Sequence, residues 1–138
     1  MKHLVPITIL AAACLGAAAP GPQVAGLWKT PVDDSVVRIA PCGRALCGRV
    51  QTSARLRAAP GQKDERNKDA ALRGRPIKGL LVLRLVPTGP GKWGDGFLYS
   101  PQDGGTYKGS LELTDDGRLR VTGCIIAPAC STQTWTRQ

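Results

Sequence analysis

Turn-forming residues divide this chain into short segments, and this division is the strongest constraint on its fold. From residue 20 onward, glycine, proline and aspartate recur about every 8 to 12 residues, a spacing typical of short antiparallel strands. The segments that qualify as strands are 26–30, 36–40, 47–52, 77–86, 93–100, 106–113, 118–126 and 132–137. The sequence therefore predicts one all-β domain over residues 20–138.

The segments 106–113 and 118–126 carry the clearest strand pattern. Each places apolar side chains on one face and polar side chains on the other, as a half-buried strand does. Between them, Asp116 and Gly117 accept the positive φ angles that a tight hairpin turn requires. Eight such strands in sequence order suggest an up-and-down barrel or a strongly curved sheet. A barrel of this size is either packed solid or holds one small ligand.

One long connection, residues 53–76, joins the expected strands 47–52 and 77–86. Residues 80–86, which follow it, are apolar on both faces apart from Arg84, which indicates that something covers the outer face of this segment. The connection is the natural cover. Asp69 is a good N-cap for residues 70–73, so we expect one short helix there.

The N-terminal residues 1–19 resemble a cleavable export signal. Lys2 is followed by an apolar run at 4–15 and by three alanines at 17–19, the small residues that a signal peptidase needs. The apolar run is shorter than the roughly 20 residues that span a bilayer, so no membrane span is expected. We expect an exported protein, periplasmic or secreted, with lipid attachment at Cys14 as the minor alternative.

Signal cleavage would remove the single histidine, His3, and one of the five cysteines. The remaining four would lie in an oxidising compartment, where thiols pair. Cys42 with Cys47 and Cys124 with Cys130 each bracket a turn, so the spacing favours two local disulfides. Crossed pairing between the two groups is the alternative. A four-thiolate zinc site usually has about two to four residues between paired ligands, so no metal is expected.

The remaining polar motifs do not specify a reaction. Residues 64–69 gather three acids and an amide, but Arg66 and Lys68 oppose a calcium loop. Asp95 and Asp103 are explained by turn formation. Without histidine or a free thiol, the usual nucleophile–base pairs are missing, so we expect neither an enzyme nor a cofactor.

The net charge of +9 is concentrated in residues 55–78, which contain eight cations. Nucleic-acid binding is disfavoured because no aromatic side chains are interleaved with these cations to stack on bases. A solvated surface is the simpler interpretation, and attraction to anionic envelope components is the functional alternative.

An ordered set of short motifs extends from residue 26 to residue 137. It comprises Gly26-Leu27-Trp28, Val37-Arg38-Ile39, Cys42, Leu46-Cys47-Gly48, Asp64, Asn67, Asp69, Leu72-Arg73-Gly74-Arg75-Pro76, Gly79, Trp93, Gly96, Tyr99-Ser100-Pro101, Tyr107, Leu119, Val121, Gly123-Cys124 and Gln133-Thr134-Trp135-Thr136-Arg137. In this set the chain resembles the domain of unknown function (DUF) 2147 family of small exported bacterial proteins.

The resemblance implies a lipocalin-like β-barrel. In that pattern, Gly26 and Trp28 lie on the first strand, and Arg137 on the last strand packs across the tryptophan. Trp135 is expected to pack within the barrel. The family brings no established activity.

These observations lead to two hypotheses of function. In the first, the barrel binds a small apolar or amphipathic molecule. The candidate contacts are Tyr99, Tyr107, Phe97 and Leu83 in the cavity, with Arg73 or Arg75 at its mouth for an anionic head. Gly109 and Gly123 are expected to leave space inside. In the second, the barrel is filled and acts as an envelope interaction or structural protein through its basic 55–78 surface.

Overall fold

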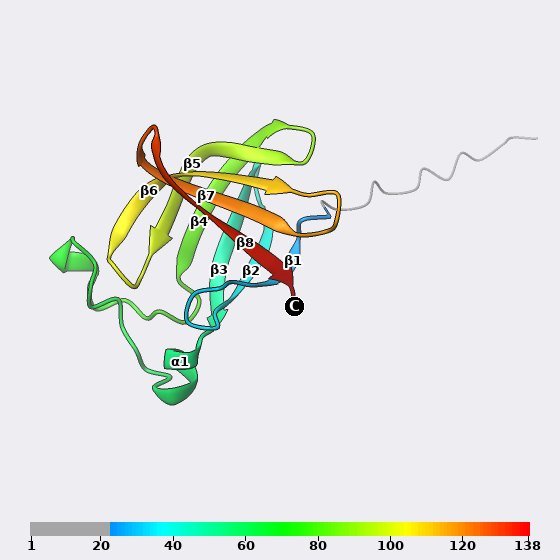
Figure 1. Cartoon of the computed structure of the whole chain (residues 1–138). Coiled ribbons are helices and arrows are strands. Elements are labelled where there is room, and N and C mark those ends of the chain that lie inside the picture. Colours follow the sequence, from blue (N-terminus) through cyan, green and yellow to red (C-terminus); the bar gives the residue numbers. More distant parts are fainter. Residues whose placement is uncertain (1–22) are drawn as a thin grey trace, which may run out of the picture.

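A computed structural model describes residues 23–138, and its eight strands form one closed barrel (Figure 1). The predicted signal segment and Cys14 lie outside the described residues. The strands are β1 (Gly26–Lys29), β2 (Val36–Cys42), β3 (Ala45–Thr52), β4 (Leu81–Gly89), β5 (Lys92–Ser100), β6 (Gly105–Leu113), β7 (Leu119–Ile126) and β8 (Ala129–Arg137). Each pairs with the next in antiparallel fashion, which confirms the predicted up-and-down arrangement.

Pairing between β1 and β8 closes the barrel. Trp28 is the register partner of Arg137, and Lys29 is that of Thr136. The Arg137 guanidinium lies 4.2 Å from the centre of the Trp28 ring, so the predicted contact is present. A Cβ on Gly26 would lie 2.9 Å from Arg137 Nη1, so only glycine leaves room for this arginine.

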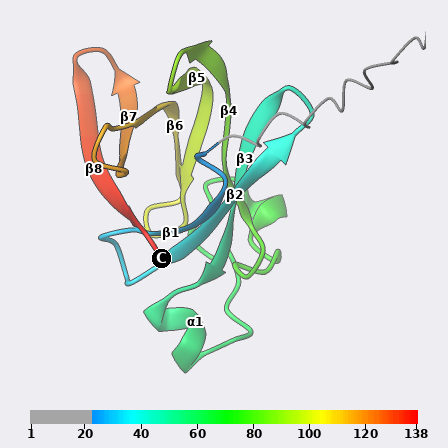
Figure 2. The ribbon, with the colours of Figure 1, turned by 90° about the vertical axis from the view of Figure 1, so that its right-hand side faces the viewer.

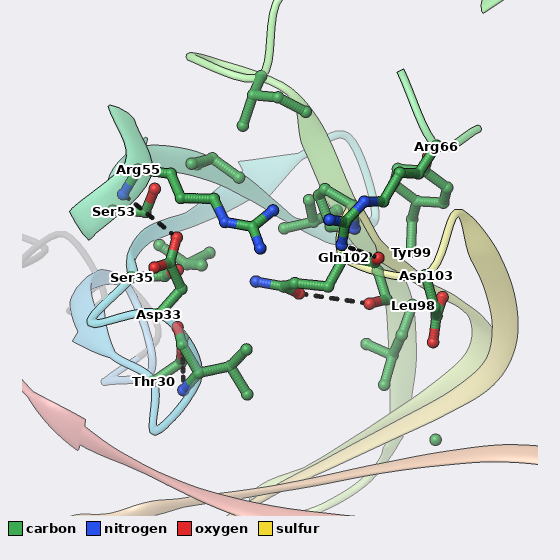
Figure 3. A pocket seen from close by; sticks show the side chains of 18 of the residues that line it. Thr30, Asp33, Ser35, Ser53, Arg55, Arg66, Leu98, Tyr99, Gln102 and Asp103 are labelled. Atoms are coloured by element: carbon green, nitrogen blue, oxygen red, sulfur yellow. Dashed lines mark hydrogen bonds between the residues drawn. The ribbon is translucent and has the colours of Figure 1, made fainter. Parts of the chain in front are cut away.

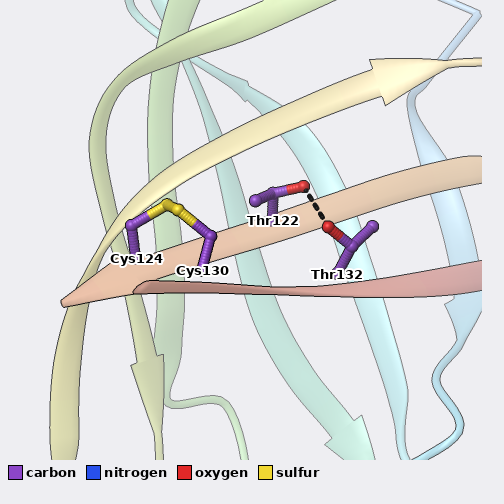
Figure 4. The surroundings of a disulfide bond; sticks show 4 residues. All are labelled: Thr122, Cys124, Cys130 and Thr132. Atoms are coloured by element: carbon purple, nitrogen blue, oxygen red, sulfur yellow. Dashed lines mark hydrogen bonds between the residues drawn. A yellow bond between two sulfur atoms is a disulfide. The ribbon is translucent and has the colours of Figure 1, made fainter. Parts of the chain in front are cut away.

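Two disulfides clamp two of the hairpins. Cys42–Cys47 joins β2 to β3 with a Cα–Cα distance of 5.8 Å. Cys124–Cys130 joins β7 to β8 with a Cα–Cα distance of 4.1 Å, beside a hydrogen bond between Thr122 and Thr132 (Figure 4). The local pairing is therefore confirmed and the crossed alternative is wrong.

The long connection contains two short helical segments instead of the one expected. The segment α1 (Ala54–Ala58) begins at Ser53, whose side chain accepts a hydrogen bond from the Leu56 amide. The predicted helix near residue 70 is a single 3₁₀ turn, η1 (Ala70–Leu72), and Asp69 caps it as expected. No helix among residues 23–138 has the length and apolar character to cross a membrane.

The expected strand at 77–86 begins four residues late. Gly79 has a φ of +79°, and the residues before β4 form a turn bonded to β3. The Gly79 amide donates to the Val50 carbonyl at 2.8 Å, and the Val50 amide donates to the Leu80 carbonyl at 3.0 Å. Ile77 and Leu80 are buried by this turn, so the end of the connection is packed against the barrel.

Candidate ligand-binding site

A cavity of about 420 Å³ lies where three connections meet the barrel. These are the β1–β2 loop, the long connection between β3 and β4, and the β5–β6 turn. Both ribbon views place α1 and the long connection at one end of the barrel, and Figure 2 shows the β2–β3 and β4–β5 turns at the opposite end. The cavity therefore belongs to the loop end that carries the long connection.

The inner wall of the cavity is mostly apolar. It consists of medium aliphatic side chains from five strands and one indole: Val37, Val50, Val82, Leu98, Val121 and Trp135. The Trp135 indole Nε1–H donates to Gln133 Oε1 at 3.0 Å, so the polar atom of this ring is satisfied inside the cavity wall. Such a wall suits an apolar body.

Farther from the long connection, toward the opposite end, the barrel interior is filled by side chains. Leu83, Leu85 and Leu119 have no exposed surface, and Leu111 has almost none. A Cβ at Gly48 would lie 2.7 Å from Leu83 Cγ, so the leucine occupies the space above that glycine. Gly109 was expected to leave space, but Leu98 and Leu85 occupy it. Gly123, by contrast, lines the cavity as expected.

The rim of the cavity is polar and contains charges of both signs. Its charged members are Asp33, Arg55, Lys63, Glu65, Arg66 and Asp103. Arg55 extends from α1 toward the centre of the opening, and Arg66 faces it from the long connection (Figure 3). Arg66 Nη1 donates to the Gln102 carbonyl at 2.7 Å, which ties the connection to the β5–β6 turn.

A buried carboxylate fixes the long connection over β5. Asp64 Oδ1 accepts from the Tyr99 hydroxyl at 2.5 Å, and Oδ2 accepts from Asn67 Nδ2 and Arg75 Nε at 2.9 Å each. Burial raises the pKa of Asp64, but these three donors outweigh it and the net pKa is lowered. For Tyr99, burial and the bond to Asp64 raise the pKa to about 12. We call Asp64, Asn67, Arg75 and Tyr99 the latch.

A second tyrosine–carboxylate pair shapes the β5–β6 turn. The Tyr107 hydroxyl donates to Asp103 Oδ2 at 2.5 Å, and the Gly105 amide donates to Oδ1 at 2.7 Å. The bond to Asp103 raises the pKa of Tyr107. Both oxygens of Asp103 therefore have a donor from within the protein.

The structure gathers only part of the predicted ligand set around the cavity. Tyr99 and Tyr107 line it. Leu83 belongs to the filled interior, and Phe97 pairs with Arg84 and Lys108 on the outer face of the barrel. Neither reaches the cavity, so their predicted placement is wrong.

The two arginines predicted for the mouth lie elsewhere. Arg75 belongs to the latch, and Arg73 Nε donates to the Asn67 carbonyl at 2.8 Å. The mouth cations are instead Arg55, Lys63 and Arg66. All three were visible among the basic residues of the connection, but nothing in the sequence indicated which of them face the barrel. Trp135, expected only to pack, is also part of the cavity wall.

A solved structure of another protein has a similar fold. A structure of a Helicobacter pylori protein, described as belonging to the lipocalin family, superimposes with a TM-score of 0.74. The two chains are 22% identical, and the match covers 86% of this chain and 84% of that one. This similarity shows a shared lipocalin-like fold. No curated protein sequence matches the chain significantly.

The sequence comparison is more specific. The family described as "Uncharacterized protein conserved in bacteria" (DUF2147) matches residues 26–137. This range contains all eight strands of the barrel, from the first residue of β1 to the last residue of β8. The motifs of the first strand, the latch and the last strand all fall within this range. The chain therefore belongs to the DUF2147 family of bacterial proteins.

Proposed function

We propose that this protein binds a small, partly apolar molecule in the cavity at the loop end of its barrel. The observation that carries the proposal is the cavity itself. Its volume of about 420 Å³ falls within the range of roughly 300–1,000 Å³ that is common for small-molecule sites. An apolar wall and a polar rim are the usual composition of such sites.

Binding is better supported than catalysis. In residues 23–138 the cysteines are all in disulfides, and the single histidine of the chain is His3. The Asp64 and Asp103 carboxylates each accept hydrogen bonds from within the protein, which suits fixed structural roles. We therefore propose a carrier or sensor of its ligand with no reaction of its own.

Export is part of the same proposal. The features of residues 1–19 and the two disulfides both fit an oxidising compartment outside the cytoplasm. A periplasmic or secreted location would place the cavity among molecules of the cell envelope.

The alternative, docking of the basic 55–78 surface on anionic envelope components, has less support. Arg57 pairs with Asp34, Arg75 pairs with Asp64, and Arg73 bonds to a backbone carbonyl. These cations hold the connection together, so fewer of them are free to act as a docking surface.

Titration with Nile red, a neutral apolar fluorophore, tests the proposal. We expect saturable binding, and we expect Val121→Phe to weaken it about tenfold or more, because the larger side chain would take cavity volume. Ile125→Phe is the matched control, since Ile125 is 77% exposed on the β7–β8 hairpin and away from the cavity lining. Absence of saturable binding to the wild-type protein would refute the proposal.

A further inference from the structure

The donors at the cavity mouth converge on one region. Arg55 begins in the first turn of α1, where its own amide donates to Asp33 Oδ2 at 3.4 Å and the Ala54 amide donates to the Asp33 carbonyl at 2.8 Å. These bonds fix where the side chain begins. Figure 3 shows the Arg55 guanidinium reaching into the opening. Among residues 23–138, this guanidinium has no hydrogen-bond or ion-pair partner within the chain.

Two further donors face the Arg55 guanidinium. Arg66 is fixed on the opposite side by the single bond from Nη1 to the Gln102 carbonyl, which leaves its other N–H groups free to bind. The Gln102 amide lies between the two arginines, with Oε1 accepting from the Ser100 hydroxyl at 3.4 Å and the nitrogen pointing toward Arg55 (Figure 3). The two guanidinium groups and the Gln102 amide therefore border the same opening.

The acids of the rim are differently placed. Asp103 is occupied by Tyr107 and Gly105, and Asp33 faces the backbone of α1. Glu65 is exposed, and it borders both this cavity and a shallow depression beside α1. Among the labelled side chains of Figure 3, Arg55, Arg66 and Gln102 reach into the opening, and all three carry N–H donors. Guanidinium groups bind carboxylates with paired, charge-assisted hydrogen bonds.

We infer that the ligand of this cavity is an amphipathic carboxylate whose acidic head is bound by Arg55, Arg66 and the Gln102 amide, and whose apolar body lies against Val37, Leu98 and Val121. This inference rests on the proposed function and names the ligand class of the same site. With about 30 Å³ for each water-sized unit, a cavity of about 420 Å³ holds roughly 14 non-hydrogen atoms. A medium-chain fatty acid such as decanoate has this size.

The test compares three ligands that share a chain but differ in the head group: decanoate, decan-1-ol and decylamine. Each displaces Nile red from the purified protein at about pH 7.5, where a carboxylic acid is ionised. We expect decanoate to bind about tenfold more tightly than the alcohol, and decylamine to bind most weakly. Raising the salt from about 0.05 M to about 0.5 M should reduce the difference in affinity between decanoate and the alcohol, because salt screens charges at a mouth that is open to solvent.

Variants assign the head-group contact. Arg55→Gln should bring the affinity for decanoate down to that for decanol and leave decanol binding unchanged. Arg55→Lys, which keeps the charge, should retain part of the preference. Arg44→Gln removes the same charge from the β2–β3 turn, so decanoate binding should not change. Circular dichroism of each variant checks that the barrel is intact.

Fatty acids of different chain length test how large an apolar body the cavity accepts. Hexanoate should bind more weakly than decanoate because it covers less apolar surface, and hexadecanoate because it exceeds the cavity. If decanol or decylamine binds as tightly as decanoate, or if Arg55→Gln leaves the preference unchanged, the head-group assignment is overturned while the proposed function stands. If neither Nile red nor any of the three ligands binds saturably, the proposed function fails as well.

Discussion

The interior of this barrel is packed solid at one end and contains a cavity at the other, although the same strands run through both ends. On β6 and β7, the residues next to their shared turn are leucines, and Leu111 and Leu119 are almost completely buried. Toward the other end, the same two strands present Tyr107 and Gly123 to a cavity. The backbone pairing continues unbroken across both ends. The difference teaches that side-chain volume, and not the path of the strands, decides where this barrel is solid and where it is open.

The filled end also explains the glycine pattern. Gly48 and Gly109 are both buried, and each lies beneath a leucine from another strand. Glycines inside a barrel can therefore complete the packing when large neighbours extend over them. Gly123 at the open end has more room, because a Cβ there would lie 3.4 Å from its nearest neighbours, Leu98 Cδ1 and Tyr107 Cβ. The connections close over the cavity from outside.

The largest effect is expected from a cavity made at the filled end. Leu83→Ala should lower the free energy of unfolding by about 2–5 kcal/mol, because Leu83 is fully buried and packs over Gly48. Urea denaturation followed by tryptophan fluorescence measures it. Affinity for Nile red should change little under conditions where the variant is folded. A loss below about 1 kcal/mol would mean that the two ends are not packed differently.

The latch should matter next. Tyr99→Phe removes the hydroxyl that donates to the buried Asp64 and should cost about 1.5–3 kcal/mol, the range for hydrogen bonds to charged groups. Hydrogen exchange should show faster opening of residues 62–77 with little change in β6 and β7 near their shared turn. Equal acceleration throughout the barrel would indicate that the connection is not held by this contact.

Acidification should release the same connection. The folded-state pKa of Asp64 lies below the ordinary value of 3.8, so the carboxylate contributes stability above that pH, and this contribution is lost as the pH falls through the lower folded value. A series of urea midpoints from about pH 6 to about pH 2 measures the loss. Asp64→Asn should flatten this dependence. An unchanged slope in that variant would assign acid sensitivity to other carboxylates.

The smallest effect is expected at the open end. Val121→Ala should cost less than Leu83→Ala, about 1 kcal/mol or less, because Val121 borders a cavity and loses fewer contacts. The pair of variants measured in one denaturation series gives the contrast directly. Equal losses would show that the wall of the cavity is as tightly packed as the filled end.

Local features of this protein could be predicted from its sequence because they depend on residues near one another. The position of the β6–β7 turn, the two local disulfides and the cap at Asp69 each involve short separations. In that turn Gly117 has the expected positive φ, +79°, but Asp116 does not, so the prediction for Asp116 is wrong. The helical segment α1 also has a local signal, the Ser53 cap, which the sequence interpretation did not use. Closure between Trp28 and Arg137, more than 100 residues apart, was available only through the family resemblance.

A bulge in β5 decides which of its side chains point into the barrel. Trp93 pairs with Leu111 and Gly96 with Gly109, so β5 has one more residue than β6 across this step, and Asp95 there has a φ of 49°. Such an extra residue moves every later side chain to the opposite face. Leu98 therefore points into the barrel, while Phe97 lies on the outer face. If side chains simply alternated along β5 from Trp93, without the bulge, Phe97 would point into the barrel and Leu98 would lie on its outer face.

The sequence by itself determined the all-β class, the eight strands in order and the two disulfide-clamped hairpins, because periodicity and turn chemistry act over a few residues. Only the tertiary structure decided which cations face the cavity. Arg55 and Arg66 reach its mouth while Arg73 and Arg75 hold the connection, although all four lie within one basic segment. Their roles follow from the path of that segment over the barrel. Asp64 and Tyr99, which are 35 positions apart, hold this path in place.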